Sequence, residues 1–496
     1  MQEIVNTIND YVWSDALIYL ALGTGLFFSF LTRFVQVRLF REMIHLLFSS
    51  KESERGISSF QALAVSLSGR VGTGNIAGVA AAIGFGGPGA VFWMWVVAFL
   101  GASTAYVESA LGQIYKEVDE GQYRGGPAFY IEKAMGQRWY GWLFAVVTII
   151  ATGLLLPGVQ ANSISSAAEV ALGTGDIYQT ALGEISFTKI TAAVVVVTVF
   201  GFIIFGGVKR IAHVTQFVVP FMALAYVITA VGIIAMNISQ LPGVIALIFG
   251  DAFTSMAGAG GIVGAAIQWG VKRGVYSNEA GQGTGPHAAS ASEVQHPAQQ
   301  GLVQAFSVYV DTLFVCSATA FMILITGAYN VHGGDGGFII QNLPAATDPN
   351  SPAFTQLALE SVVPGVGKPF VAVALFFFAF TTVLAYYYIA ETNVAYLRRF
   401  FRFPGEMLFL KIAMMGSVFY GAIRTASLAW GLGDIGVGLM AWLNIIAILI
   451  LFFMGNAALK ALKDYEAQRK AGVENYTFDP EALGIRNADF WSRPKT

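Results

Sequence analysis

Four glycines crowd one stretch of the sequence, SLSGRVGTGNIAGVA, which covers residues 66–80. Each glycine inside a helix costs roughly 1 kcal/mol relative to alanine, so this run predicts an interrupted helix. At membrane depth, an interruption is tolerated only where protein or a water-filled cavity satisfies the freed backbone groups. The half-helix that follows could bind a carboxylate at its N-terminus, and the half-helix before it could offer carbonyls to a cation. Thr73 and Asn75 among the glycines favour this interpretation over a close helix–helix contact through small residues.

Arg70 lies within the same run, and a charge near the middle of a membrane is normally paired. Candidate partners are Asp311, Glu108 and Glu279, which are placed on or beside other apolar segments. We expect these residues to form a structural or gating ion pair rather than to contact a ligand. Asp311 could alternatively carry a proton.

Two further polar features lie in apolar segments. Thr381 and Thr382 form an adjacent hydroxyl pair that could supply oxygen ligands to a desolvated cation. The alternative, which the residues alone favour, is that each hydroxyl bonds the carbonyl one turn back. Gln160 carries an amide that needs a partner, either a neighbouring helix or a substrate.

The composition points to a membrane. Hydrophobic residues make up 55% of the 496 residues and charged residues only 12%, about half of what a soluble domain uses. A membrane-spanning helix needs about 20 apolar residues. The sequence predicts an all-α polytopic membrane protein with eleven transmembrane helices, near 15–32, 60–84, 90–115, 139–171, 188–208, 211–236, 251–271, 301–329, 369–397, 405–429 and 435–459. Segments 38–50 and 352–363 are predicted to be helices that lie on the membrane surface.

The distribution of Lys and Arg predicts the topology. Alternate connecting segments carry 23 of the 28 basic residues, and the segments between them carry none. Because basic residues accumulate on the cytoplasmic side, we expect the N-terminus outside, the C-terminus in the cytoplasm and the plasma (inner) membrane as the location.

An internal repeat follows from this topology. Residues 1–59 hold an accessory helix and an interfacial helix, and 460–496 form a cytoplasmic tail. The ten helices between them form two halves of opposite orientation, 60–236 and 251–459. The leading helices align at glycines, with Gly72 opposite Gly258 and Gly74 opposite Gly260. Inverted halves with interrupted leading helices are typical of secondary transporters. The run around Gly258 lacks polar side chains, so a packing role competes there.

The sequence gives little support for other classes of protein. The sequence has no HExxH, GxSxG or P-loop motif, and its histidines lack metal-ligand spacing, so we expect no enzyme and no cofactor. A net charge of −2 gives no reason to expect nucleic acid as a partner. A channel would not need inverted halves with two interrupted helices.

Several motifs together resemble those of the alanine or glycine:cation symporter family, also called sodium:alanine symporters. In chain order they are GRVGTGNIAGVAAAI, GGPGAVFWMW, GGPAFYIE, GVYSNEAGQGTGPHAAS, HPAQQGLVQ and DTLFVCSATA. The resemblance implies a LeuT-like fold of two inverted five-helix repeats preceded by one extra helix. It also implies uptake of alanine or glycine with sodium as the coupling ion. A sodium-independent or proton-coupled permease or exchanger is the alternative, and an ion channel a weaker one.

By analogy with that fold, the substrate lies between the two interrupted helices. The resemblance implies substrate contacts from Gly72, Thr73, Gly74, Asn75, Gln160, Gly258, Gly260 and Tyr386. It implies sodium ligands from Gly69, Gly72, Thr381 and Thr382. The gating residues expected from the buried charges are Arg70, Glu108 and Asp311. One departure stands out, because the family usually reads Gly-Trp where this chain has Ala385-Tyr386. The choice between alanine and glycine is therefore open.

Overall fold

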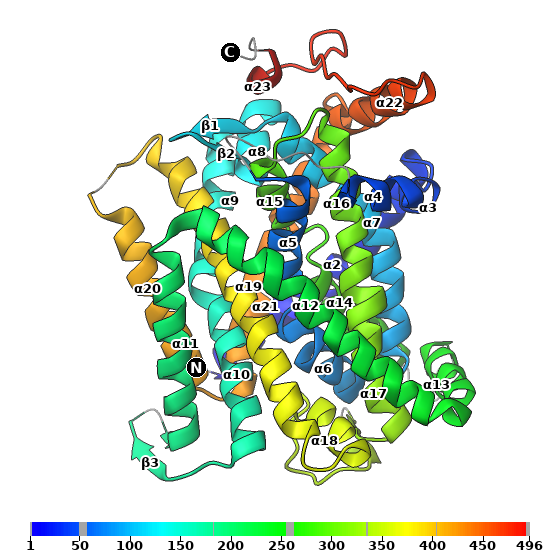
Figure 1. Cartoon of the computed structure of the whole chain (residues 1–496), viewed down its shortest axis with the longest axis vertical. Coiled ribbons are helices and arrows are strands. Elements are labelled where there is room, and N and C mark those ends of the chain that lie inside the picture. Colours follow the sequence, from blue (N-terminus) through cyan, green and yellow to red (C-terminus); the bar gives the residue numbers. More distant parts are fainter. Residues whose placement is uncertain are drawn as a thin grey trace.

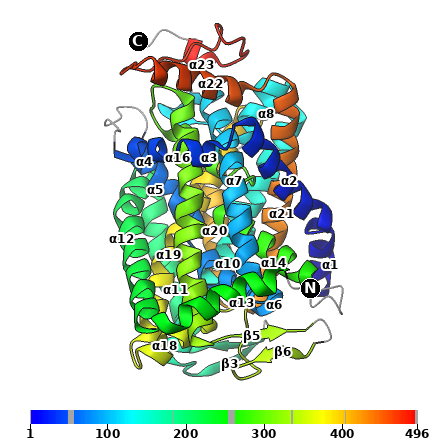
Figure 2. The same cartoon turned by 90° about the vertical axis from the view of Figure 1, so that its right-hand side faces the viewer.

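Long helices stacked side by side form the body of the molecule (Figures 1 and 2). The computed structural model describes residues 2–48, 57–181, 183–253, 262–333, 336–402 and 404–492. The elements up to residue 204 are α1 (Gln2–Val12), α2 (Asp15–Leu31), α3 (Val35–Arg38), α4 (Phe40–Phe48), α5 (Ser59–Arg70), η1 (Thr73–Asn75), α6 (Ala77–Gly86), α7 (Ala90–Ile114), β1 (Glu117–Asp119), β2 (Gln122–Arg124), α8 (Pro127–Met135), α9 (Arg138–Ile150), η2 (Ala151–Leu155), α10 (Leu156–Leu172), β3 (Ile177–Thr180), β4 (Gly183–Ser186) and α11 (Phe187–Ile204).

The remaining elements are α12 (Gly207–Met236), η3 (Ile238–Gln240), α13 (Leu241–Phe253), α14 (Ile262–Asn278), α15 (Gly285–Ala291), α16 (Pro297–Val308), η4 (Tyr309–Cys316), α17 (Ser317–Thr326), β5 (Asn330–His332), β6 (Phe338–Gln341), α18 (Ala353–Val362), α19 (Gly367–Arg398), α20 (Glu406–Ala422), α21 (Ala426–Phe453), α22 (Ala457–Lys470) and α23 (Asp489–Ser492). Here η1 and η3 are 3-10 turns, and η2 and η4 are π-helical segments. The strands form three antiparallel hairpins, β1–β2, β3–β4 and β5–β6.

The two ends of the bundle differ. One end, here named the tail end, carries α4, α8, α22 and α23, and the opposite end, the hairpin end, carries α18 and the strands β3, β5 and β6 (Figure 2). The surface helices predicted over 38–50 and 352–363 correspond to α4 and α18. Both lie at ends of the bundle rather than along its body (Figures 1 and 2).

Seven described helices are long and apolar enough to cross a membrane, and an eighth span results if the bent pair α1–α2 counts as one. The chain is therefore a helical polytopic membrane protein. Three of the predicted spans fall on shorter helices: α5 with α6, α14, and α20. The count of eleven remains a prediction.

Three predicted boundaries are wrong. Residues 251–253 end α13, and the helix that follows runs over Ile262–Asn278 rather than stopping at 271. Residues 430–434, expected in a loop, lie inside α21. Lys272 and Arg273, counted in a connecting segment, lie inside α14, where both pair with Asp434. Charges that neutralise each other within a bundle do not mark the end of a span. For this reason, the search for apolar runs ended the predicted span before Lys272 and Arg273.

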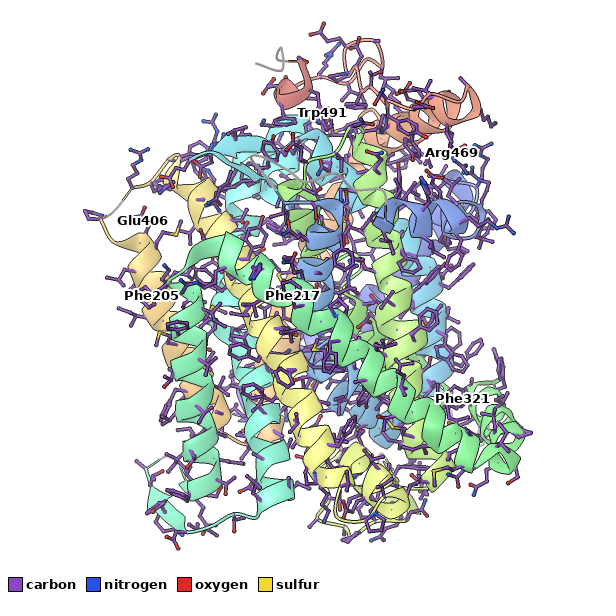
Figure 3. All side chains as sticks on the ribbon, in the orientation of Figure 1. Phe205, Phe217, Phe321, Glu406, Arg469 and Trp491 are labelled. Atoms are coloured by element: carbon purple, nitrogen blue, oxygen red, sulfur yellow. The ribbon has the colours of Figure 1, made fainter. Side chains whose placement is uncertain are left out.

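The outer face of the bundle is apolar. On α12 the exposed residues recur at helical spacing: Phe217, Phe221, Leu224, Ile228 and Val231 are each more than half exposed. Figure 3 shows Phe205 and Phe217 on the outside of the molecule. A helix with an apolar outer face needs an apolar solvent, which here is lipid.

Candidate functional site

The predicted interruption of the first glycine-rich helix is present. α5 ends at Arg70, a 3-10 turn covers Thr73–Asn75, and α6 resumes at Ala77. A methyl group placed on Gly72 would collide with the hydroxyl of Thr382 and lie 3.0 Å from Oε1 of Gln160. The backbone at this break therefore touches α10 and α19 so closely that only glycine fits.

A second interruption lies after α14. Gly258 and Gly260 fall outside the described residues, and the described break separates α14 from α15 over residues 279–284. Glu279, Gly281 and Gly283 take left-handed φ values of 57°, 85° and 82° there. Two glycines at left-handed positions let the chain leave one helix and enter the next without a large steric cost.

The two breaks meet inside the bundle. A methyl group on Gly74 would lie 3.1 Å from Cα of Ser277, and one on Gly69 would lie 3.1 Å from Oε2 of Glu279. Two interrupted helices therefore face each other with unwound backbone on both sides. Such backbone is stable within a membrane only when other groups satisfy its donors and acceptors.

Asp311, in the π-helical segment η4, joins both sides of this region. Its Oδ1 accepts hydrogen bonds from Nδ2 of Asn75 at 2.6 Å and from Oγ of Ser277 at 3.0 Å. Its Oδ2 accepts one from Oγ1 of Thr312 at 2.6 Å. The buried carboxylate thus ties the first break to the last turns of α14. Sequence reasoning missed Ser277 and Thr312, although both lie in motifs that carry the family resemblance.

Arg70 makes no ion pair among the described residues, so the expected direct pairing is absent. Its Nη1 donates to the carbonyl of Gln304 at 3.1 Å and to the hydroxyl of Ser307. Glu108, Glu279 and Asp311 lie close enough to interact with it electrostatically. Nε and Nη2 of this buried guanidinium have no hydrogen-bond partner in the described structure.

The three acids have other donors instead. Glu108 accepts hydrogen bonds from the backbone N–H groups of Gly281 and Gly283, at 3.3 and 3.2 Å, and from Nδ2 of Asn444 at 2.7 Å. Glu279 accepts one from Oγ1 of Thr284 at 2.9 Å. Each of the three carboxylates, Asp311 included, thus accepts hydrogen bonds from neutral donors, and none is paired with Arg70 among the described residues.

Polar groups without partners gather around the two breaks. Among the described residues, Oγ1 of Thr73, Nδ2 of Asn278 and Oε1 of Glu279 are buried with no hydrogen-bond partner. Such groups are rare in folded proteins and call for a water or a ligand. Gln160 lies beside them, because its Oε1 accepts a hydrogen bond from the N–H of Thr73 at 3.0 Å.

Aromatic rings lie around the same region. Tyr276 and Tyr386 both interact with Gln160, and the ring of Tyr276 packs 4.8 Å from that of Trp430. Trp430 in turn lies 3.5 Å from the position of a methyl group on Gly78. Aromatic rings and the amide of Gln160 thus lie together beside the first break.

The two adjacent hydroxyls on α19 have different hydrogen-bond partners. The hydroxyl of Thr381 donates to the carbonyls of Phe377 and Phe378, at 2.9 and 3.0 Å, within its own helix. That of Thr382 also bonds the carbonyl of Phe378, but lies 3.5 Å from the carbonyl of Val71. Thr382 therefore faces the first break, and the described hydrogen bonds of Thr381 stay within α19.

A buried charge cluster lies beside this aromatic group, between α14 and α21. Asp434 accepts from Nη1 of Arg273 and Nζ of Lys272, each at 2.8 Å. The Arg273 guanidinium also lies 4.3 Å from the ring centroid of Trp430. The cluster thus fastens α14, which leads into the second break, to α21. Sequence reasoning missed it because these residues had been placed in loops.

Comparisons with known proteins agree with this architecture. The solved structure of MhsT in complex with L-phenylalanine matches 81% of this chain and 99% of its own, with a TM-score of 0.53 and 14% identity. At this identity the likeness shows the fold alone. Because MhsT is a LeuT-like structural neighbour, the match supports the expected fold class at the level of helix arrangement.

Proteins compared by sequence are much more similar to this chain than MhsT is. A putative sodium/proton-dependent alanine carrier of Bacillus subtilis is 57% identical over 496 residues, which are 100% of this chain and 99% of the relative. A sodium/proton-dependent alanine carrier of Bacillus sp. PS3 is 49% identical over 90% of this chain and 97% of its own length. A sodium/alanine symporter of Methanococcus maripaludis is 36% identical over 95% of this chain and 99% of its own.

These relatives are carriers and symporters, which confirms the expectation that the chain is not an enzyme. The family model described as the sodium:alanine symporter family matches residues 1–480. The chain therefore belongs to the sodium:alanine symporter family.

Proposed function

We propose that this protein carries a small neutral amino acid, alanine or glycine, into the cell together with sodium, by alternating access. The observation that carries the proposal is the meeting of two interrupted helices at buried polar groups that lack partners. A zwitterion supplies both kinds of group that such a place needs, acceptors for the free donors and donors for the free acceptors.

The substrate carboxylate is proposed to lie at the first break, near Gly72, Thr73, Gly74 and Asn75. The free hydroxyl of Thr73 and the positive end of the following helix favour a negative charge there. The ammonium group points to the second break, where Oε1 of Glu279 has no partner. The side chain of the substrate then faces Tyr386, which limits its size.

The coupling sodium is proposed to lie between the first break and α19. Thr382 is the favoured side-chain ligand, because its hydroxyl faces both Gly72 and the carbonyl of Val71. Carbonyls near Gly69 and Gly72 complete the site, with Thr381 as a further candidate. Binding of sodium would order the break before the amino acid arrives.

The topology belongs to the proposal as well. The interrupted helices α5–α6 and α14–α15 are taken to lead two inverted five-helix repeats, over 60–236 and 251–459, within eleven spans in the plasma membrane. The N-terminus then lies outside and the tail, 460–496, in the cytoplasm. This assignment rests on the bias of basic residues, and it places the tail end of the bundle inside the cell.

Proton coupling is the second candidate, and Asp311 is the observation that favours it. This carboxylate is fully buried, contacts both interrupted helices and makes no ion pair among the described residues. Two of the relatives named above are described as sodium/proton-dependent carriers, which supports either ion as the coupling ion.

Binding of labelled alanine to the purified protein tests the proposal. We expect saturable binding that needs sodium, is displaced by glycine and serine, and ignores leucine. Thr382→Ala should raise the sodium concentration needed for half-maximal binding. Alanine binding that is equal with and without sodium would reject sodium coupling at this site, and no binding under any ion condition would reject the substrate.

A further inference from the structure

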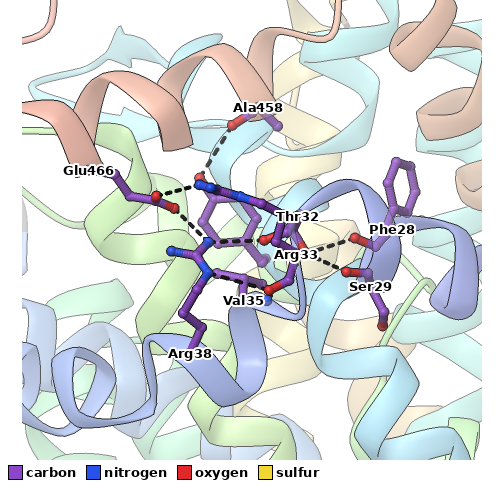
Figure 4. A network of polar contacts seen from close by, with 9 residues as sticks. Phe28, Ser29, Thr32, Arg33, Val35, Arg38, Ala458 and Glu466 are labelled. Carbon is purple, nitrogen blue, oxygen red and sulfur yellow. Dashed lines mark hydrogen bonds and ion pairs between the residues drawn. The ribbon is translucent and has the colours of Figure 1, made fainter.

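The chain after α21 folds back over the tail end of the bundle. α22 lies across this end, and residues 471–492 continue over it (Figures 1 and 2). Glu466 on α22 accepts hydrogen bonds from Arg33 at 2.8 Å and from Arg38 at 2.7 Å (Figure 4). α22 is thus fastened to the turn that follows α2 and to α3.

A second attachment centres on His296, the N-cap residue of α16. Its Nε2 lies 3.1 Å from Oδ2 of Asp464, and its ring packs against Tyr465 and Phe478. Burial lowers the pKa of His296, which favours a neutral ring that donates its Nε2 hydrogen to Asp464. Phe478 packs on Trp491, 5.3 Å between ring centroids, which extends the attachment to the end of the described chain.

The last described residues enclose a buried cation. Nζ of Lys116 lies 4.5 Å from the ring centroids of Tyr123 and Phe490 and 5.5 Å from that of Trp491. Nε1 of Trp491 also donates to the carbonyl of Gln113 at 3.0 Å. Lys116 is only 1% exposed, so its contacts with these rings are largely desolvated, which is the setting where cation–π attraction is strongest.

Lys116 and Gln113 in turn hold the end of α15. Nζ of Lys116 donates to the carbonyl of Ser292 at 2.8 Å, and Nε2 of Gln113 donates to the same carbonyl at 3.0 Å. Ser292 directly follows α15, the half-helix beyond the second break. A cation at a helix C-terminus is well placed to bind the carbonyls exposed there.

The first interrupted helix joins at the same point. The N–H of Ile57 donates to the carbonyl of Ala291 at 3.1 Å, and the N–H of Glu293 donates to the carbonyl of Ile57 at 3.1 Å. These bonds connect the approach to α5 with the end of α15. Both half-helices on the tail side of the two breaks are therefore tied together where Lys116 binds.

We propose that residues 471–492 form a latch that holds the site closed toward the tail end, with Lys116 as the positioning residue. The rings of Phe490 and Trp491 hold Lys116, and Lys116 holds the end of α15 at the point where the backbone of Ile57 joins it to the start of α5. Opening toward the tail end must separate these half-helices and so works against the latch. This inference rests on the alternating access proposed above, and it assigns the C-terminal segment a role in setting the balance between the two states.

Cys316, the one cysteine of the sequence, provides a native reporter. Its Sγ lies 3.3 Å from Nδ2 of Asn75 and 3.2 Å from Oγ of Ser277, at the proposed site. Its rate of reaction with a membrane-impermeant thiol reagent, added to vesicles from the tail side, measures opening toward that side.

The double variant Phe490→Ala with Trp491→Ala should raise this labelling rate at least fivefold, and saturating alanine with sodium should slow it again. The variant Phe490→Tyr, which keeps a ring, should label at the wild-type rate. Trp139→Ala is the matched control, because Trp139 is 62% exposed and its described contacts do not include the tail. Thermal unfolding of each purified variant reports folding.

The latch is overturned if the double variant labels at a rate within twofold of wild type. The same holds if neither protein is labelled. If the double variant fails to fold, Lys116→Met takes its place with the same expected rise, and Lys116→Arg should restore slow labelling. Alanine uptake by the wild type is measured in parallel. Absence of wild-type uptake counts against the proposed function, whereas normal uptake with unchanged labelling counts against the latch alone.

Discussion

Replacing Gly72 by alanine should disable transport without unfolding the protein. The added methyl would collide with the hydroxyl of Thr382 and lie 3.0 Å from Oε1 of Gln160. Overpacking of this kind typically costs about 1–3 kcal/mol. If this cost applies to the protein with its ligands bound, the affinity for those ligands falls about 5- to 150-fold, since 1.4 kcal/mol corresponds to a factor of ten.

The same substitution should affect both ligands. Pushing Thr382 away moves a proposed sodium ligand, and pushing Gln160 away breaks its 3.0 Å hydrogen bond with the N–H of Thr73. We therefore expect Gly72→Ala to raise both the sodium concentration for half-maximal uptake and the KM for alanine. Shortening the obstructing side chain, in Gly72→Ala with Thr382→Ala, should recover little, because Gln160 still obstructs the methyl.

Uptake of labelled alanine into proteoliposomes, at varied sodium and varied alanine, measures both quantities. Gly232→Ala is the matched control, because no atom lies within 4 Å of the position of its added methyl. Its uptake should equal that of wild type. A Gly72→Ala protein with wild-type sodium dependence and wild-type KM would refute the placement of both ligands at the first break.

Three further predictions test other parts of the site. Thr382→Ala should raise the sodium concentration for half-maximal uptake at least tenfold, and Thr381→Ala should raise it much less. Titration of uptake with sodium measures both values. Equal effects would indicate that Thr381 is a sodium ligand as well. Asp434→Asn leaves Arg273 and its neighbouring lysine without their buried counter-ion. The free energy of unfolding should therefore fall by several kcal/mol, which thermal unfolding measures. An unchanged Tm would mean that the cluster does not stabilise the protein. Tyr386→Trp should narrow competition against labelled alanine toward glycine and alanine at the expense of serine; an identical competition profile would show that Tyr386 does not line the pocket.

The first break was predictable because its sequence is unusual in itself. Glycines beside Thr73 and Asn75 in an apolar stretch contradict a continuous helix, whatever packs against them. Its partners Thr382 and Gln160 were expected only through the family resemblance. The closeness of Thr382 to Gly72 depends on how α19 crosses the break, which no local pattern encodes.

The glycine run predicted as the second break, around Gly258, lies outside the described residues and stays a prediction. That run lacks polar side chains, and glycines alone also suit close helix packing. A break that the structure does describe lies at the segment with Glu279, Gly281 and Gly283, where left-handed backbone and a buried acid occur together. Glycines combined with polar side chains, the feature that identified the first break, would have found the second.

The charged residues show the main limit of reading a single sequence. Arg70 was correctly expected inside the bundle, where it is 1% exposed, but its partners were not. Its guanidinium binds Gln304 and Ser307, neutral groups that no charge pattern selects. Conversely, Arg273 and Asp434 were placed in loops because a local window cannot see that they neutralise each other across two helices.

The central claim is that a sodium gradient drives alanine across the membrane through the site between the two broken helices. The most direct measurement is the accumulation of labelled alanine in proteoliposomes under an imposed sodium gradient, with equal pH on both sides. If a membrane potential of 100 mV, negative inside, is imposed together with the sodium gradient, each sodium ion supplies about 2.3 kcal/mol more, roughly a fiftyfold concentration ratio. We predict accumulation above the external concentration that collapses when a sodium ionophore is added. Uptake that only equilibrates alanine under the sodium gradient, or that accumulates it under a pH gradient in the absence of sodium, would contradict the account.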